Sequence, residues 1–498
     1  MSLHQLHTVL LAGGLVLLAS IAAARTASRV GLPALLVFLA LGAILGEDGL
    51  GLEFDDAALA QALGTAALAV ILVEGGLTTR WGDIRKRLAP AAVLSTVGVA
   101  ISVVVTAVGA SLILGIDWRL ALLLGAIVSS TDAAAVFSIL RAVPLPRRLA
   151  GLLEAESGLN DAPTVILVML ISVGGPTASN PFAAAGHIAY ELVVGGLIGL
   201  GIGWLGTTVL RRVALPASGL YPLATVGLGI VAFAFAGTVD ASGFLAAYLT
   251  GLVLGNTGLP HRAAVQSFAE GLGWLAQIGL FVMLGLLATP SQLPKAVVPA
   301  LIVGLVLLLL ARPLSVFVSV TPFRIRWREQ IFLSWAGLRG AVPIVLATIP
   351  LVHNVPGSDG VFDIVFVLVA FYTLIQGPSL PVAARLLRLT TPGQAREVGV
   401  EAAPLDVLGA EMLTITVPPG SRLNGVEIFE LRLPRAAVVT LVVRGEDAFV
   451  PAPSTRLKTD DELLIVTYDN TRETTEQRLR AIGRYGRIAN WVTAGPAA

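Results

Sequence analysis

Long apolar segments separated by short polar loops make up residues 1–389 of the chain. A helix of about 20 apolar residues crosses the hydrocarbon core of a membrane, so each long apolar segment predicts one membrane-spanning helix. The hydropathy pattern predicts about 13 such spans. They are Leu6–Ala24, Val30–Gly46, Ala57–Leu77, Leu88–Leu114, Arg119–Leu140, Leu149–Val173, Phe182–Leu210, Leu220–Thr238, Gly243–Thr257, Phe268–Ala288, Pro294–Val318, Gln330–Leu351 and Val361–Leu389.

The pattern changes after Leu389. Residues 390–404 resemble a linker, and residues 405–498 alternate apolar and polar positions as a soluble domain does. Strands are predicted at Glu411–Val417, Ala437–Arg444 and Leu463–Tyr468, a short helix at Leu423–Leu431 and a polar helix at Arg472–Tyr485. We therefore expect a polytopic all-α membrane domain over residues 1–389, followed by the linker and a small cytoplasmic α+β domain with a C-terminal tail.

Basic residues alternate between successive loops. One side of the predicted membrane receives Arg25, Arg29, Arg80, Arg85, Lys86, Arg87, Arg141, Arg147, Arg148, Arg211, Arg212, Arg262, Arg324, Arg326 and Arg328. The other side receives little beyond Arg119 and Lys295. Because cytoplasmic loops carry an excess of Lys and Arg, we expect the N-terminus outside and the C-terminus in the cytoplasm. The expected location is the cytoplasmic (inner) membrane, with lipid as the surrounding partner.

Composition supports a membrane protein and removes several other classes. The chain is 55% hydrophobic and 13% charged, whereas soluble proteins carry about 25% charged residues. A net charge of +1 gives no reason to expect a nucleic-acid partner. The chain has no cysteine, and its five histidines are scattered, so neither thiolate chemistry, a transition-metal site nor a catalytic triad is expected. No enzyme activity and no cofactor are predicted.

The sixth span contains a polar cluster, Leu152–Thr164. It places Glu154, Glu156, Asn160 and Asp161 among apolar residues. A charged side chain at membrane depth costs about 2.5–3.5 kcal/mol on insertion scales and by default indicates a functional site. The alternative is that these residues cap a helix end at the membrane surface. We favour the functional interpretation, because apolar sequence continues on both sides.

Two other spans are interrupted by polar or helix-breaking residues, at Val128–Ser138 and Leu333–Pro343. They occupy corresponding positions in two halves of the chain. Paired broken segments are the sequence pattern of an inverted-repeat transporter with a binding site at the membrane midplane. The alternative is two small-residue packing faces. Packing alone does not explain Asp132 and Arg339, which lie at the centres of the two breaks.

The residues of the sixth span fall on adjoining helix faces. Ser157 and Asp161 are four residues apart, as are Glu156 and Asn160, so one stripe offers two carboxylates, a hydroxyl and an amide. Thr131 would face this stripe if the broken fifth span crosses it. Oxygen ligands with few charges suit a hard monovalent cation. Asp161 is the preferred site for competition between a cation and a proton, and Glu156 is the second choice.

Arg339 needs a partner if it is buried. We predict that it contacts Glu156 and Asn160; the alternative is that it snorkels to the cytoplasmic interface. Asp132 would neutralise the positive helix ends at the breaks. Three other polar residues rank lower: Glu74 is predicted to be interfacial, Gln376 to be a packing residue, and Glu191 has no assigned role.

Three motifs resemble those of the NhaP-type monovalent cation:proton antiporters. They are TDAAAVFS at Thr131–Ser138, ESGLNDAPT at Glu156–Thr164 and GLRGAVP at Gly337–Pro343. The resemblance implies an inverted-repeat core with two crossed broken helices, and a homodimer. It also implies a cation held by Asp161, Ser157 and the Thr131 backbone, with Glu156 acting through water and Asn160 and Arg339 as supports. An Asn at position 160 is the pattern associated with electroneutral exchange.

The sequence departs from this family in two places. Many members have Pro where this chain has Ala133, and many have Pro directly after the Asn-Asp pair, where this chain has Ala162 before Pro163.

The tail resembles the C-terminal regulator-of-potassium-conductance (TrkA-C) module, on the features of Val417–Tyr468. Such modules usually pair and can bind a small molecule, including a nucleotide, so a cytoplasmic regulatory ligand is expected.

The leading hypothesis is a potassium/proton antiporter, in which the cation assignment depends on the tail. A sodium/proton antiporter with the same mechanism is the nearest alternative. A cation channel is less favoured, because the sequence has one clustered carboxylate site and no carbonyl filter motif. A receptor with a vestigial transporter core would not need to retain Asp161 and Ser157.

Overall fold

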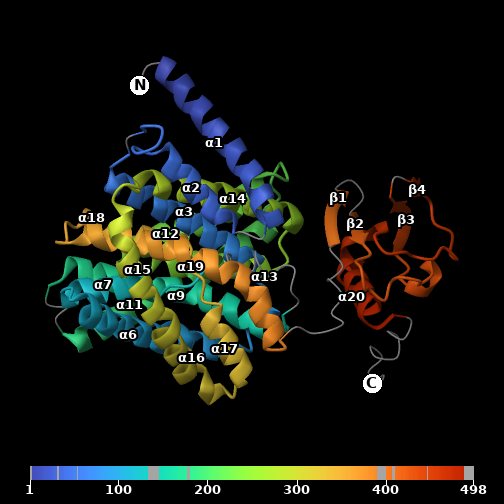
Figure 1. Cartoon of the computed structure of the whole chain (residues 1–498). Coiled ribbons are helices and arrows are strands. Elements are labelled where there is room, and N and C mark those ends of the chain that lie inside the picture. Colours follow the sequence, from blue (N-terminus) through green and yellow to red (C-terminus); the bar gives the residue numbers. More distant parts are fainter. Residues whose placement is uncertain are drawn as a thin grey trace. The chain divides into compact units, whose positions relative to one another are not determined.

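The computed structural model describes residues 3–30, 33–52, 54–132, 145–175, 180–389, 400–405, 410–445 and 447–486. The chain divides into two compact units, Met1–Leu389 and Thr390–Ala498 (Figure 1). The second half of the fifth predicted span, with Ala133–Ser138, lies outside the described residues.

The first unit consists of helices. They are α1 (Leu3–Val30), α2 (Ala34–Leu45), α3 (Ala57–Thr78), α4 (Trp81–Ile84), α5 (Leu88–Val93), α6 (Val99–Leu114), α7 (Trp118–Ile127), α9 (Arg147–Val173), α11 (Pro181–Arg212), α12 (Leu220–Thr238), α13 (Gly243–Asn256), α14 (Arg262–Leu287), α15 (Leu293–Val306), α16 (Arg312–Val320), α17 (Trp327–Trp335), α18 (Ala341–Val352) and α19 (Ser358–Leu386). Within the described ranges, eight helical stretches are long and apolar enough to cross a membrane, and shorter apolar helices accompany them. The unit is therefore a helical membrane domain, as predicted.

Glycines allow some of these helices to approach closely. A Cβ atom at Gly76 of α3 would lie 2.3 Å from the Tyr248 carbonyl oxygen of α13, and one at Gly251 would lie 2.5 Å from the Val73 carbonyl oxygen. Neither position can carry a side chain without moving a helix. Small residues at helix crossings are a common way to pack helices in lipid, where no hydrophobic effect drives them together.

Two predicted spans contain a π-helical turn. The turn η1 (Leu94–Gly98) joins α5 to α6, and η2 (Leu307–Ala311) joins α15 to α16. The η1 turn packs on α16, where the Ser315 hydroxyl donates a hydrogen bond of 2.8 Å to the Gly98 carbonyl. A π turn adds one residue to a helical turn and often marks a functional site. Here η2 ends immediately before Arg312, a buried residue of α16.

The second unit contains a five-stranded antiparallel sheet in the order β1-β2-β5-β3-β4, with helix α20 (Asp469–Tyr485). The strands are β1 (Val400–Leu405), β2 (Ala410–Thr416), β3 (Ala437–Arg444), β4 (Asp447–Phe449) and β5 (Glu462–Tyr468). Leu413, Ile415, Ile465 and Leu479 are in its apolar core. The three predicted strands and the helix are present.

The structure differs from the predictions for this unit in three details. Part of the residues assigned to a linker forms β1, with Pro404 on an edge strand where proline is tolerated. The short strand β4, which begins at Asp447, was not among the predicted strands. Of the predicted helix Leu423–Leu431, only Ile428–Leu431 is helical, as the 3-10 turn η4.

An ion pair between the partly exposed Arg444 and the buried Asp461 joins the sheet of the second unit to its neighbouring loop. Asp461 is fully buried and accepts hydrogen bonds from Arg444 Nε (2.7 Å), Arg444 Nη2 (2.8 Å) and the Lys458 N–H (2.7 Å). Burial by itself raises the pKa of Asp461, but the hydrogen bonds and positive charges of Arg444 and Lys458 outweigh it and hold the pKa below its ordinary value.

Asp461→Asn is expected to destabilise the second unit near neutral pH by about 2–3 kcal/mol, because Arg444 loses a charged partner. A carboxyl with a lowered pKa stabilises the fold above its unfolded-state pKa, and the stabilisation is lost as the pH falls through the folded-state value. Hydrogen exchange of β5 amides in the full chain should therefore be faster in the variant at pH 7. The difference from the unsubstituted chain should shrink in acid. Asp460→Asn, at an exposed neighbour with φ of 66°, is the matched control; equal protection in both variants would contradict this role.

Candidate ion-binding site

The backbone is unwound at two places inside the membrane domain. Helix α7 ends at Ile127, and the chain is not helical from Ser130 to Asp132; helix α17 ends at Trp335, and α18 starts at Ala341. Ser, Thr and Asp side chains compete with helical hydrogen bonds in the first segment. Gly337 and Gly340 loosen the backbone of the second segment. Both breaks lie where the sequence predicted them.

The two unwound segments bind each other. The Asp132 N–H donates a hydrogen bond of 2.9 Å to the Leu338 carbonyl. In return, Arg339 Nε donates one of 2.7 Å to the Val128 carbonyl. Non-helical backbone is tolerated at membrane depth only where its polar groups find partners. The breaks therefore stabilise each other.

Helix α9 is fixed to the first break through Thr131. The Ser157 hydroxyl donates to the Thr131 carbonyl (2.7 Å), and Asn160 Nδ2 donates to the Thr131 hydroxyl (2.5 Å). Glu156, Asn160 and Asp161 are all at least nine-tenths buried. The prediction that Thr131 faces the polar stripe of α9 agrees with this geometry.

Asp161 is buried beside this junction. Its Oδ1 atom has no hydrogen-bond partner among the described residues, and neither has the Oδ1 atom of Asn160. An unpaired carboxylate oxygen is costly in a low-dielectric interior. The two atoms are therefore available to a ligand that brings positive charge.

Asp132 points towards the start of α18. A Cβ atom at Gly340, the residue that precedes α18, would lie 1.8 Å from Asp132 Oδ2. Only glycine leaves room for this carboxylate. A negative charge at a helix N-terminus is stabilised by the helix dipole, which agrees with the expectation that Asp132 neutralises a helix end.

The ionic partner of Glu156 is Arg312 and not Arg339. Arg312 Nη2 lies 2.6 Å from Glu156 Oε1, and both side chains are almost fully buried. The predicted contacts of Arg339 with Glu156 and Asn160 are wrong: no hydrogen bond or ion pair joins them, and Asn160 binds Thr131 instead. The sequence analysis missed Arg312, although an arginine inside the apolar run Leu301–Val320 is itself a signal.

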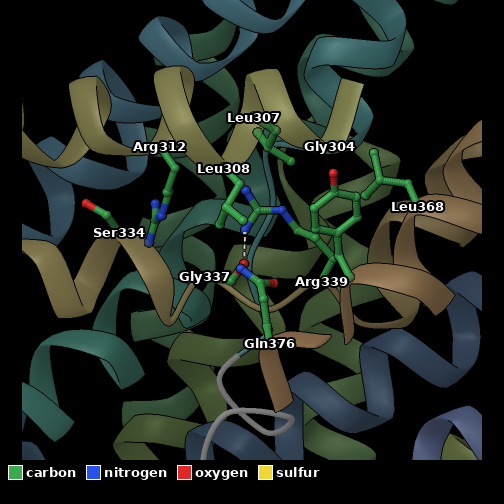
Figure 2. A pocket seen from close by; sticks show the side chains of 10 residues that line it. Gly304, Leu307, Leu308, Arg312, Ser334, Gly337, Arg339, Leu368 and Gln376 are labelled. Carbon is green, nitrogen blue, oxygen red and sulfur yellow. Dashed lines mark hydrogen bonds between the residues drawn. The ribbon is translucent and has the colours of Figure 1, made fainter. Parts of the chain in front are cut away.

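Arg339 instead binds backbone carbonyls. Besides Val128, it donates through Nη1 to the Gly337 carbonyl at 2.7 Å, the contact drawn in Figure 2. Its own carbonyl accepts from the Thr373 hydroxyl of α19 at 2.9 Å, and Gln376 Nε2 donates to the Trp335 carbonyl at 3.1 Å. The snorkelling alternative is excluded, since Arg339 is 3% exposed. Gln376 acts as the packing residue that was expected.

A small cavity lies beside the two arginines. It is lined by Arg312, Arg339, Tyr372 and Gln376 among others (Figure 2), and its volume of about 10 Å³ has room for a single water molecule. Arg312 Nε has no partner within the described part of the chain.

Two carboxylates that were left aside lie elsewhere. Glu74 packs against α14, where a Cβ atom at Gly273 would be 3.1 Å from its Cγ. Glu191 pairs with His187 one turn away on α11, with 2.9 Å between Oε1 and Nε2. Neither contact joins them to the Thr131 junction.

Buried oxygen atoms beside two unwound segments of membrane helices are typical of the ion sites of secondary transporters. The sodium/hydrogen exchanger transmembrane family matches residues 16–386, and the TrkA-C domain family matches residues 412–480. The chain therefore belongs to the sodium/hydrogen exchanger family. It is a multi-pass cation/proton antiporter with a TrkA-C domain.

Several antiporters are similar over most of the chain. The K(+)/H(+) antiporter NhaP of Alkalimonas amylolytica is 40% identical over 82% of this chain and 71% of its own length. The K(+)/H(+) antiporter NhaP2 of Shewanella oneidensis is 37% identical over 95% of this chain and 83% of its own length. The Na(+)/H(+) antiporter NhaS2 of a Synechocystis strain is 30% identical over 65% of this chain and 62% of its own length.

A solved structure shares the fold. The sodium proton antiporter MjNhaP1 from Methanocaldococcus jannaschii aligns with a TM-score of 0.64, over 77% of this chain and 98% of its own length. At 24% sequence identity, this similarity shows the arrangement of the helices alone.

Arg312→Gln is expected to destabilise the membrane domain by about 3–5 kcal/mol, because it leaves Glu156 buried without its cation. The double variant Glu156→Gln, Arg312→Gln removes both charges and should be more stable than Arg312→Gln alone. Thermal unfolding of the purified chain in detergent, followed by tryptophan fluorescence, would report both effects. Arg85→Gln, at an exposed arginine, is the control. A double variant that unfolds no later than the single variant would exclude this ion pair.

Proposed function

We propose that the protein exchanges potassium ions for protons across the cytoplasmic membrane by alternating access. The potassium assignment follows from the relatives named K(+)/H(+) antiporters, which are similar to this chain over up to 95% of its length. The TrkA-C domain match agrees with it. The proposed mechanism depends on Asp161 and the polar residues around it.

The cation and the proton would compete for Asp161. The observation that carries this role is its buried Oδ1 atom without a partner among the described residues. In our proposal the cation is held by Asp161, Ser157 and the Thr131 carbonyl, with Glu156 acting through water. Asn160, Asp132 and Arg339 would support these ligands, and we add Arg312 to the supporting residues because it is the ionic partner of Glu156.

The balance of charges favours one-for-one exchange. The carboxylates of Asp132, Glu156 and Asp161 lie in the same region as the guanidinium groups of Arg312 and Arg339, so these five described residues together carry one excess negative charge. A buried uncompensated charge is costly. Either one potassium ion or one proton neutralises it, which makes the loaded states electrically equivalent and supports an electroneutral cycle.

The proposed setting is a thirteen-span inverted repeat with two crossed broken helices. Its N-terminus would be outside and its C-terminus in the cytoplasm, as the distribution of basic loops indicates. Two copies would associate in the membrane as a homodimer. The domain assignment is an exchanger over residues 1–389, joined by the segment after it to a regulatory module.

Sodium/proton exchange at the same site is the second candidate. It is favoured by the family description and by the similarity to NhaS2. The ligands proposed for potassium are also oxygen atoms that sodium accepts, so only transport measurements with each cation separate the two functions.

Asp161→Asn is expected to abolish exchange and leave the protein folded, because the amide takes up no proton and, without a negative charge, does not make cation and proton compete for one site. The purified chain would be placed in proteoliposomes that hold a pH gradient and an internal pH dye. Potassium should dissipate the gradient in the unsubstituted chain and not in the variant.

Glu270→Gln, at an exposed carboxylate of α14, serves as the control. Exchange by Asp161→Asn at the normal rate would remove Asp161 from the mechanism. A gradient that sodium dissipates and potassium does not would favour the second candidate function.

Removal of the module after Leu389 is expected to alter regulation and to retain transport, because the site lies wholly in the first unit. The truncated chain should still dissipate a pH gradient when potassium is added. The dependence of its rate on cytoplasmic solutes, such as a nucleotide, should change. Loss of transport by a truncated chain that unfolds at the normal temperature would contradict a purely regulatory role.

A further inference from the structure

Ser130 is a buried residue in the first unwound segment, and it is not one of the ligands proposed above. It precedes Thr131, is 1% exposed, and its hydroxyl has no hydrogen-bond partner in the described part of the structure. Its neighbour Ser129 behaves differently: the Ser129 hydroxyl donates to the Gly125 carbonyl one turn back, at 2.6 Å. The bond of Ser129 continues the helix, whereas Ser130 lies beyond its end. A buried hydroxyl without a partner costs free energy, so its retention requires an explanation.

The residues around Ser130 explain why its hydroxyl is buried there. Ser130 directly precedes Thr131, whose carbonyl and hydroxyl bind Ser157 and Asn160 of α9, so it lies beside the turn of α9 that carries Asp161. Asn160 Oδ1 and Asp161 Oδ1 also lack partners among the described residues. By contrast, both oxygens of Thr131 already accept one hydrogen bond each, the carbonyl from Ser157 and the hydroxyl from Asn160, which leaves the carbonyl a second lone pair for a ligand. Ser130 therefore contributes an unused neutral oxygen beside the carboxylate.

We propose that the Ser130 hydroxyl is a further ligand of the transported cation and favours potassium over sodium. This inference rests on the proposed cation site at Asp161. Potassium is larger than sodium and gathers more oxygen atoms around it, as in potassium filters built from neutral oxygens. Loss of one neutral ligand therefore weakens potassium binding more than sodium binding.

A neutral hydroxyl is also suited to the state in which Asp161 is protonated. A serine hydroxyl both donates and accepts hydrogen bonds and rotates to suit its neighbours. With the cation bound, its oxygen lone pairs face the ion. With Asp161 protonated, the same oxygen accepts the carboxyl O–H. Because Ser130 carries no charge in either state, it changes the affinity for the cation and leaves the charge balance of the site unaltered.

The test is a titration of transport in proteoliposomes with potassium and then with sodium. Ser130→Ala should raise the KM for potassium by about five- to tenfold, the usual effect of one lost hydrogen-bonding group. The KM for sodium should change by less than about twofold, and the maximal rate should stay within about twofold for both ions. Ser130→Thr, which keeps the hydroxyl, should restore the potassium KM.

Two matched controls separate ligation from local disturbance. Ser129→Ala removes an equally buried hydroxyl from the preceding residue, and Ser319→Ala removes a buried hydroxyl of α16 that has no hydrogen-bond partner among the described residues. Both should leave the potassium KM unchanged. If Ser130→Ala fails to fold, Ser130→Cys keeps the size and replaces the hard oxygen by a soft sulfur, with the same expected rise.

An unchanged potassium KM in Ser130→Ala would overturn the proposal, as would an equal rise for both ions or the same rise in Ser129→Ala. These outcomes differ from a failure of the proposed function. In that case the unsubstituted chain itself would show no proton flux in response to either cation.

Discussion

The membrane domain depends on the mutual satisfaction of two interrupted helices. Backbone groups freed at membrane depth have no water to bind, so each break must find its partners in protein. Here the N–H of Asp132 binds the carbonyl of Leu338, and the guanidinium of Arg339 binds the carbonyl of Val128. Neither break would be stable without the other. Together they place Thr131 where Ser157 and Asn160 of α9 bind it, and this contact brings the proposed ligands of α9 next to the first break.

Ion pairs and helix ends then determine which carboxylates of the site are already stabilised by positive charge. Glu156 is held by Arg312, and Asp132 lies at the start of α18. Among the described residues, no ion pair is formed with Asp161, and its Oδ1 atom has no hydrogen-bond partner. In the proposed mechanism, such a site takes either one cation or one proton, because the arginines neutralise all but one of the negative charges of the named carboxylates. The same arrangement explains why several polar atoms of the site are buried and unsatisfied.

Much of this could be predicted from the sequence, because hydropathy and local chemistry are local properties. The long apolar helices of the described residues fall on predicted spans, and Thr131 faces Ser157 and Asn160, as expected if the broken fifth span crosses the sixth. The partner of Glu156 could not be predicted. Arg312 follows a π turn that the sequence LLLLA does not reveal, and that turn sets which way the arginine points. Strand β1 was missed for a related reason: the sequence VEAAPL becomes a strand by pairing with β2 and has little preference of its own.

The contact between Gly340 and Asp132 limits how this protein can evolve. A methyl group at position 340 would fall on the carboxylate oxygen, so even the smallest replacement forces the acid to move. Position 340 can gain a side chain only after position 132 has changed, although more than 200 residues separate the two in the chain. Lineages of this antiporter that explore new cargo would therefore have to vary the less constrained oxygen donors around the pair.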